Sequence, residues 1–306
     1  MKHPAKRALD HAAPKQQRNW DWRAAANFIA GGAGGGLLLC ASLVNLEPYA
    51  ARIAILLGIV LIGCGLTCVW FEIGRPWRAM NVYRHAATSW MTREAFVALA
   101  LFAAAAWAAF SLEPTFVASA GILGLVFLYI QAQMLAANKG IPAWRPPRCI
   151  PLLMASSLTE GAGFVTCLSS PSDFLPAVWV PAGLIALIAA RAFLWNRYFG
   201  ALIAEGAPEG TIKVLSAMEP KFLLYGHVLP TLLVAIAASG MAGRPGLLFA
   251  AGIMVVAAGW ALKFTLVRRA GFTQGAALQR LPVRGRGAGG AAVKPGWAVV
   301  GSAKSG

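Results

Sequence analysis

The sequence predicts an all-α polytopic membrane protein with eight transmembrane helices, and we expect these to form two four-helix bundles. Three observations lead to this fold class. The 306 residues are 58% hydrophobic and only 12% charged, whereas soluble domains contain about 25% charged residues. Eight apolar stretches are long enough to cross a bilayer, which takes about 20 residues each. Lys and Arg residues gather at alternate connections between these stretches.

The expected spans divide the chain into three parts. A basic N-terminal tail covers residues 1–25, and the eight-helix domain covers 26–269. Residues 270–306 are rich in Gly, Ala and Arg without apolar periodicity, so we expect a disordered basic tail there. The N-terminal tail has no apolar core before position 24, which is unlike a cleavable signal peptide. The expected spans are residues 26–46, 52–71, 94–111, 116–137, 150–169, 174–194, 222–241 and 246–267.

The positive charges predict an orientation in the membrane. With the N-terminus inside, 25 of the 27 Lys and Arg residues lie inside or at inner span ends, and only Arg52 and Arg244 fall outside. The positive-inside rule therefore places both termini in the cytoplasm, and we expect the bacterial inner membrane as the location. The net charge of +16 sits at span ends and in the tails, which favours membrane lipids over nucleic acid as the partner.

The sequence argues against haem and metal centres in this chain. His227 is the only histidine within a span, whereas a b-type haem held by helix histidines needs two. The five cysteines form no CxxC pair, so neither an iron–sulfur cluster nor a zinc site is expected. We interpret the cysteines as small packing residues.

The loop between the second and third spans, Glu72–Glu94, is the densest cluster of charged, aromatic and histidine residues outside the termini. Glu72 closes the second span, and Glu94 opens the third. Thr92 can cap the third span, where exposed N–H groups favour a nearby carboxylate. Glu72 lies at a helix C-terminus, which disfavours a carboxylate unless Arg75 or Arg78 compensates its charge.

These residue types suit proton exchange with a lipid-soluble quinone. A quinol loses protons as it loses electrons, and a partly buried carboxylate can accept one of them. Arg or His can hold the quinone oxygens, and Trp can pack on the ring. The alternative interpretation is a salt-bridged cytoplasmic loop without redox function. The candidate residues for quinone binding and proton exchange are Glu72, Arg75, Arg78, His85, Trp90 and Glu94.

Two ionisable residues lie inside later spans. Glu160 falls near the middle of the fifth span, where a carboxylate is either functional or a hydrogen-bonded link between helices. His227 in the seventh span precedes Pro230, which frees the carbonyl near Gly226 and is expected to kink the helix. We take Glu160 and His227 as candidate proton-path residues.

Two further features of the spans have structural interpretations. The small-residue pairs Gly31/Gly35 and Gly32/Gly36 in the first span let another helix approach closely. Arg191 and Lys263 are expected near inner span ends, where long side chains snorkel to water and need no further role.

Three motifs of the chain resemble a known family. They are GRPWRA at Gly74–Ala79, SWMTRE at Ser89–Glu94, and IPAW at Ile141–Trp144 after the fourth span. They look like the membrane-anchor subunits of dimethyl sulfoxide reductase and polysulfide reductase (the DmsC/NrfD family), and the order and spacing of the spans agree. The resemblance implies an eight-span subunit of a complex iron–sulfur molybdoenzyme that binds quinone or quinol without haem.

The resemblance also implies roles for single residues. Glu94 falls on the family's quinol-site glutamate. Glu72 stands where the dimethyl sulfoxide reductase anchors have a histidine implicated in quinol binding, so that role is changed here. Gln133 and Leu135 stand where an arginine and a tyrosine are common among those anchors. These departures bear on the type of quinone and on the direction of electron flow.

From this resemblance we expect a non-catalytic electron-transfer subunit. It would pass electrons between the quinone pool and an iron–sulfur subunit, which serves a molybdopterin catalytic subunit docked on the cytoplasmic side. The opening WDWRAAANF and the cytoplasmic loop are similar to the membrane subunit of phenylacetyl-CoA:acceptor oxidoreductases. That similarity suggests an acyl-CoA as the substrate of the complex.

Two other function classes stay open at this point. A secondary transporter would use Glu160 and His227 as a coupling pair and the Pro230 break as its midplane site, and it predicts inverted halves with matching broken helices. A membrane enzyme acting on lipids would need a nucleophile–base or metal constellation, which two loop carboxylates match poorly.

Overall fold

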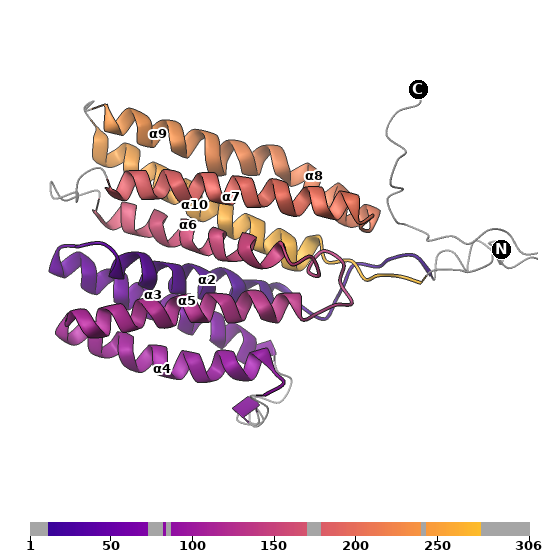
Figure 1. Cartoon of the computed structure of the whole chain (residues 1–306), viewed down its shortest axis with the longest axis horizontal. Helices are drawn as coiled ribbons and strands as arrows, with labels where there is room; N and C mark the ends of the chain where they lie inside the picture. The colour runs from indigo at the N-terminus through magenta and orange to yellow at the C-terminus, as the bar shows by residue number, and fades with distance from the viewer. Residues whose placement is uncertain (1–11, 73–81, 84–86, 170–178, 240–242, 277–306) are drawn as a thin grey trace, which may run out of the picture.

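A computed structural model describes residues 12–72, 82–83, 87–169, 179–239 and 243–276 (Figure 1). Over these ranges the chain is helical apart from its connections and ends, and an isolated β-bridge joins Gln16 and Phe272. Eight helices in the described ranges are long and apolar enough to cross a membrane. The expected all-α class and the expected number of spans are therefore confirmed.

Two of the eight spans contain a π-helical segment, labelled η. The segment η2 divides the seventh span between α8 and α9, and η3 ends the eighth. In chain order the elements are α2 (Trp22–Ser42), α3 (Pro48–Glu72), α4 (Trp90–Ser111), α5 (Pro114–Ala136), α6 (Cys149–Ser169), α7 (Trp179–Ala204), α8 (Glu209–Leu223), η2 (Leu224–Val228), α9 (Leu229–Ala238), α10 (Arg244–Phe264) and η3 (Thr265–Arg269).

The spans form two rings of four helices, in agreement with the expected pair of bundles (Figure 1). In the first ring, α2, α3, α4 and α5 each pack against the next, and α5 returns to α2. In the second ring, α6, α7, α9 and α10 do the same. The rings join where α2 packs against α6 and α10, which explains why α2 and α6 are the most completely buried spans.

Most spans lie within about one turn of their expected bounds, but two extend much further. The sixth, expected over residues 174–194, is α7 and continues to Ala204. The seventh, expected over residues 222–241, already begins at Glu209, because α8 extends the helix by four turns. This first part is amphipathic and contains Lys213 and Lys221, so its low hydropathy concealed it in the sequence.

Glycines let α2 lie directly against α6. A Cβ atom at Gly36 would overlap with the carbonyl group of Ser157, and one at Gly161 would overlap with the backbone of Gly36. The small residues of α2 therefore serve close helix packing, as predicted.

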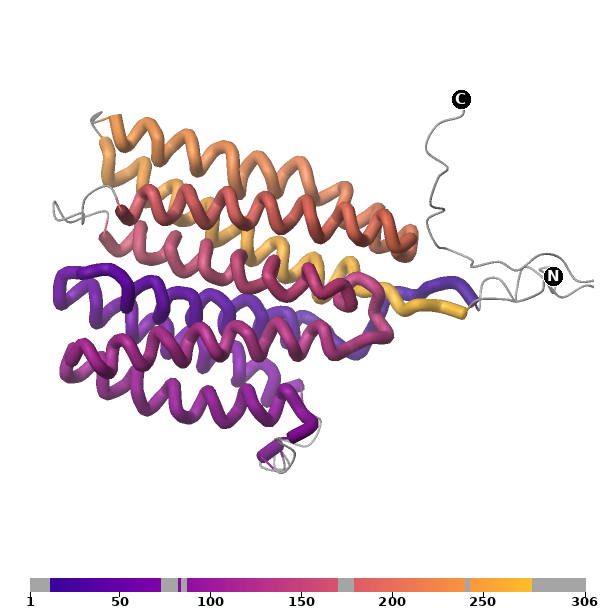
Figure 2. The backbone as a smooth tube through the Cα atoms, viewed as in Figure 1, coloured from indigo at the N-terminus to yellow at the C-terminus, as the bar shows by residue number. Residues whose placement is uncertain are grey.

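The two ends of the described chain pair with each other (Figure 2). The backbone N–H of Gln17 donates to the carbonyl of Gly271, and that of Thr273 donates to the carbonyl of Lys15, both at 2.8 Å. We call residues 12–21 and 270–276 the terminal arms, and the end of the bundle from which they extend the terminal end. The first residues of the expected disordered tail are thus paired, whereas 277–306 lie outside the described residues. That the terminal end faces the cytoplasm stays a prediction.

We expect Gly36→Ala to destabilise the protein by about 1–3 kcal/mol, because the added methyl group overlaps with α6 in a close-packed region. Gly183 in α7 is the matched control, since a Cβ atom there would have no neighbour within 4 Å. Gly183→Ala should raise stability by roughly 0.5–1 kcal/mol, because alanine is the better helix former. Thermal unfolding in detergent compares the two variants, and a Gly36→Ala protein as stable as Gly183→Ala would contradict this packing.

Candidate functional site

Glu94 lies in the second turn of α4 with its side chain inside the first ring of helices, where it is 2% exposed. Its Oε1 atom accepts hydrogen bonds from the side-chain amides of Gln131 in α5 (3.1 Å) and Asn27 in α2 (3.3 Å). The Gln131 amide also donates to the backbone carbonyl of Asn27 (3.2 Å). Three helices therefore share one polar group of side chains, which we call the amide–carboxylate cluster (Asn27, Glu94 and Gln131).

The start of α4 determines where Glu94 lies. The Ser89 hydroxyl caps the helix by accepting a hydrogen bond from the Thr92 backbone N–H (3.3 Å), and the Thr92 hydroxyl donates to the carbonyl of Val82. The expectation that Thr92 caps this helix is therefore wrong. Because α4 begins earlier, at Trp90, Glu94 faces the interior instead of the exposed N–H groups of the first turn.

Glu72, the last residue of α3, borders the same cavity as Glu94. The cavity has a volume of about 40 Å³, which holds a water molecule but no quinone ring. The two carboxylates singled out in the sequence thus meet at the terminal end of the first ring. The remaining residues around the cavity are Trp20, Ala24, Asn27, Phe28, Val69, Met91 and Met134.

Trp90 is not among the described residues around this cavity. Its ring lies edge-on to Tyr129 with 6.2 Å between ring centroids, and the Arg93 guanidinium lies 4.3 Å from its centre. Gln133 donates to the Tyr129 hydroxyl (2.7 Å) and takes no part in the amide–carboxylate cluster. The other predicted loop residues, Arg75, Arg78 and His85, lie outside the described residues.

The N-terminal arm contributes to the cavity, which reasoning from the sequence missed. Trp20 borders the cavity and stacks on Trp144 of the IPAW motif, with 5.0 Å between ring centroids. Trp144 donates a hydrogen bond from Nε1 to the carbonyl of Leu266 (2.9 Å). The motif therefore holds the arm between the first ring and the last helix.

A second link joins the arm to the end of α3. Asp21 caps α2 and forms an ion pair with Arg23 (2.8 Å), and the hydrogen bonds from Arg23 lower the pKa of the Asp21 carboxyl. Arg23 also donates to the carbonyl of Phe71 (2.8 Å), and its charge acts on Glu72. The positive charge of Arg23 in α2 therefore lies at the C-terminal end of α3. We expected this charge to come from Arg75 or Arg78 of the loop.

Asn27 and Gln131 are functional candidates that we did not select from the sequence. Each is an amide within an apolar span, and a polar side chain at that depth calls for a partner, so this signal could have found them. Asn27 Oδ1 is buried without a hydrogen-bond partner among the described residues. A buried acceptor of this kind can take a proton donor from a water or a ligand.

A second polar cluster lies within the second ring, where it borders α2 of the first ring. Glu160 in α6 forms a 2.9 Å salt bridge with Lys263 in α10, and their side chains are 0% and 1% exposed. The Ser156 hydroxyl donates to the other carboxylate oxygen (3.1 Å). The expectation that Lys263 snorkels to water is wrong, because Gly32 in α2 leaves the space that its ammonium group fills.

Arg191 is also buried, at 0% exposure, so the same expectation is wrong for this residue. Its guanidinium donates to the carbonyls of Gly226 (2.7 Å) and Val255 (3.0 Å) and to Nε2 of His227 (3.3 Å). The Gly226 carbonyl is the one that Pro230 leaves without an N–H donor, as predicted.

The contacts of His227 define its tautomer. Arginine only donates hydrogen bonds, so Nε2 of His227 must accept the one from Arg191. The proton therefore sits on Nδ1, which donates to the carbonyl of Phe222 (3.0 Å).

Glu160 and His227, paired in the sequence hypothesis, have separate partners in the fold. Helix α10 lies between them: Val255 accepts from Arg191, and Gly259 packs against Glu160 one turn further along. Residues of this region do not form a metal site: no group of three or more His, Cys, Asp or Glu suited to a metal occurs among the described residues.

The two polar clusters approach each other between the two rings. Gln131, which bonds Glu94, and Lys263, which bonds Glu160, border one small cavity of about 10 Å³.

Comparison with known proteins bears on this site directly. Residues 37–172 match the family model of the DMSO reductase anchor subunit (DmsC). The resemblance found in the loop motifs is thereby confirmed for this part of the chain. The match runs from the middle of α2 to just beyond α6 and includes Glu72, Glu94 and Glu160. None of the curated proteins compared with the chain matches it.

The DmsC match supports a membrane-anchor subunit of a molybdoenzyme. The matched residues include Glu94, Gln131 and Glu160, but Asn27, His227 and Lys263 lie outside them. Their part in the site rests on the geometry described above.

We expect Lys263→Met to destabilise the protein by about 3–5 kcal/mol, because it leaves the Glu160 carboxylate buried without its counter-charge. Replacing both partners, as Glu160→Gln/Lys263→Met, should recover most of the loss, since no isolated charge remains. Lys139→Met, at an exposed lysine of the α5–α6 connection, is the control for loss of a positive charge. Thermal unfolding of the three variants in detergent measures the coupling, and a single variant as stable as the double one would refute it.

Proposed function

We propose that this chain is the quinone-binding membrane anchor of a molybdopterin oxidoreductase and passes electrons between the quinone pool and an iron–sulfur subunit. One observation carries the proposal: the buried Glu94 carboxylate, held by two amide donors beside a cavity, within the part of the chain that matches the DmsC family. A quinone supplies a two-electron, two-proton redox couple when bound, so its site needs a residue that exchanges protons.

The residues around Glu94 fit a quinone head group chemically. The unpaired Asn27 Oδ1 is an acceptor for a quinol hydroxyl, and the Trp20 ring offers an apolar surface. The cavity must widen to admit a ring. Met91 and Met134 border it, and methionine side chains adapt readily to a ligand.

Each member of the amide–carboxylate cluster has its own role in this proposal. Gln131, held by the Asn27 backbone carbonyl, donates to Glu94 in either protonation state. Asn27 can present its NH₂ group to the carboxylate or, after rotation of the amide, its oxygen to the carboxylic acid. Glu94 therefore binds or releases a proton at its carboxyl oxygens with a partner for both forms. Glu72, half-buried beside the cavity, is the proposed relay to water.

We also propose Glu160 and His227 as residues of a proton path. Support for Glu160 comes from the small cavity that Lys263 shares with Gln131, which connects it towards Glu94. His227 lies further along, tied to the same region through Arg191 and α10.

The partner subunits would dock at the terminal end. The connection between α5 and α6 carries three exposed positive charges there, at Lys139, Arg145 and Arg148. These charges support an acidic surface on the iron–sulfur subunit as their complement. An acyl-CoA such as phenylacetyl-CoA as the substrate of the catalytic subunit stays an expectation from the sequence resemblance.

A secondary transporter is the less favoured function. It requires Glu160 and His227 to couple to each other, but each already has a cationic partner, Lys263 and Arg191 respectively. It also predicts matching broken helices in the two halves. In the described residues π-helical breaks occur in two spans of the second ring, and the spans of the first ring are continuous.

We expect Glu94→Gln to lower quinol-linked turnover of the intact complex by about 100-fold or more, the usual effect of removing a general acid–base group. Glutamine keeps the shape and still accepts from Asn27 and Gln131, so partner subunits should assemble normally. Turnover with a soluble quinol analogue and recovery of the complex are measured in parallel.

The control for this variant is Glu113→Gln, which makes the same change at the exposed start of α5 at the opposite end of the bundle. It should leave turnover unchanged. If the Glu94→Gln complex turns over as fast as this control, Glu94 is not the proton-exchanging residue.

Purification of the tagged chain in mild detergent tests the partners. We expect an iron–sulfur subunit, a molybdenum-containing subunit and bound quinone to elute with it, as judged by metal analysis and quinone extraction. A chain that elutes from its native membrane with neither iron nor quinone would argue for the transporter, and flux assays on Glu160→Gln and His227→Gln would follow.

A further inference from the structure

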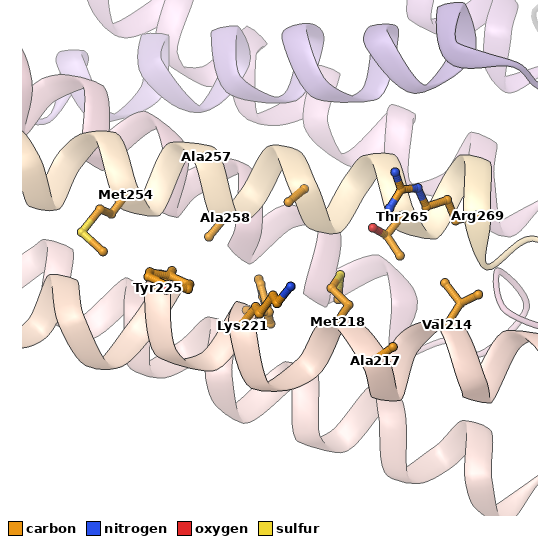
Figure 3. A pocket seen from close by; sticks show the side chains of 12 residues that line it. Val214, Ala217, Met218, Lys221, Tyr225, Met254, Ala257, Ala258, Thr265 and Arg269 are labelled. Carbon is orange, nitrogen blue, oxygen red and sulfur yellow. The ribbon is translucent and has the colours of Figure 1, made fainter.

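A large cavity lies between the last two spans, apart from the Glu94 site. Its volume is about 680 Å³, and it is bordered by α8 and η2 on one side and by α10 and η3 on the other. Figure 3 shows the lining side chains between the two helices, with Met254 and Tyr225 at one end and Val214 and Arg269 at the other. A space of this size matches a small-molecule site.

Small side chains on both helices create this space. Ala217 lines it from α8, and Ala257, Ala258 and Ala261 line it from α10. Helix α10 packs closely against η2 and α9 but only loosely against α8, so the helices part towards the terminal end. The wall of α10 is therefore smooth and apolar over more than one turn, which suits an acyl chain.

The charges around the cavity have one sign. Lys221 on α8 and Arg269 on η3 are both exposed, and the lining includes no carboxylate. Thr265 adds a hydroxyl group between them along the cavity (Figure 3). Arg269 lies at the terminal end of the cavity, and Lys221 lies nearer its middle, one turn from Tyr225 (Figure 3). The described lining has no charged side chain beyond Lys221 in the direction of Tyr225 and Met254, so this part of the cavity is apolar.

We propose that this cavity binds one anionic phospholipid. The phosphate would lie against Lys221 and Arg269, and an acyl chain would follow the alanines of α10 towards Met254. Basic pockets between transmembrane helices select anionic headgroups, since each Lys or Arg near the membrane surface adds attraction. A neutral quinone would leave both cations without a counter-charge, and a soluble anion would make no use of the apolar wall.

A bound lipid would support the second ring of helices. Phe222 lines the cavity, and its ring lies 4.7 Å from the His227 ring and 5.4 Å from the Arg191 guanidinium. A lipid that covers Phe222 would close the gap between α8 and α10 next to these buried polar groups.

Native mass spectrometry of the delipidated full chain tests the proposal with phosphatidylglycerol and phosphatidylcholine as anionic and zwitterionic probes. We expect one tightly held phosphatidylglycerol, bound about tenfold more strongly than phosphatidylcholine. Lys221→Gln/Arg269→Gln should abolish this preference, whereas Lys221→Arg should keep it. The matched control is Lys139→Gln/Arg197→Gln, which removes two exposed charges that do not border the cavity.

A cavity-filling variant tests the contribution of the apolar wall to lipid binding independently of the two charges. Ala257→Phe should lower retention of phosphatidylglycerol severalfold, and Ala106→Phe, on an exposed position of α4, should not. Equal binding of the two lipids, or an unchanged preference in Lys221→Gln/Arg269→Gln, would overturn the proposal. Displacement of a quinone by Ala257→Phe would also overturn it and would assign the cavity to quinone.

Discussion

The contact of α2 with its neighbours through glycines is the constraint on which the rest of the structure depends. At Gly36 it brings α2 against α6 and so joins the two rings of helices. One turn away, Gly31 leaves room for the amide of Gln131, and Gly32 leaves room for the ammonium group of Lys263. Two adjacent faces of one helix, one towards α5 and one towards α6 and α10, therefore permit close packing and accommodate both buried polar clusters. A methyl group at any of these glycines would disturb packing and chemistry together.

The two buried carboxylates are stabilised in opposite ways, and this difference separates their roles. Glu160 has a lysine as counter-charge and a serine hydroxyl on its other oxygen, and these partners favour its ionised form. Glu94 has only neutral amides as its partners among the described side chains, and amides serve both an ionised and a protonated carboxyl group. A residue that must change its protonation state at each turnover needs the second arrangement. This reasoning supports Glu94 over Glu160 as the proton-exchanging residue of the proposed quinone site.

Much of the fold could be predicted because lipid imposes simple rules of length and apolarity on a span. The site was harder to predict, because its partners come from distant segments. Glu72 and Glu94 were identified in one loop, but Asn27, Gln131 and Trp20 join them only through helix packing. From the sequence, Lys263 and Arg191 look like snorkelling residues near span ends. In the fold, Lys263 fills the space beside Gly32, and Arg191 donates to the Gly226 carbonyl in the π-helical segment η2, so both side chains are buried.

The pairing of the terminal arms has a consequence for biogenesis. The N-terminal arm can pair with residues 270–276 only after the last span has been synthesised, because the Gln17 N–H donates to the Gly271 carbonyl. Trp20, at the end of this arm, completes the wall of the Glu94 cavity. All the spans must therefore be synthesised before the cavity can close, and a protein truncated before residues 270–276 would insert its helices yet lack a finished cavity wall. Closure of the arms thus couples completion of the proposed site to insertion of the last span.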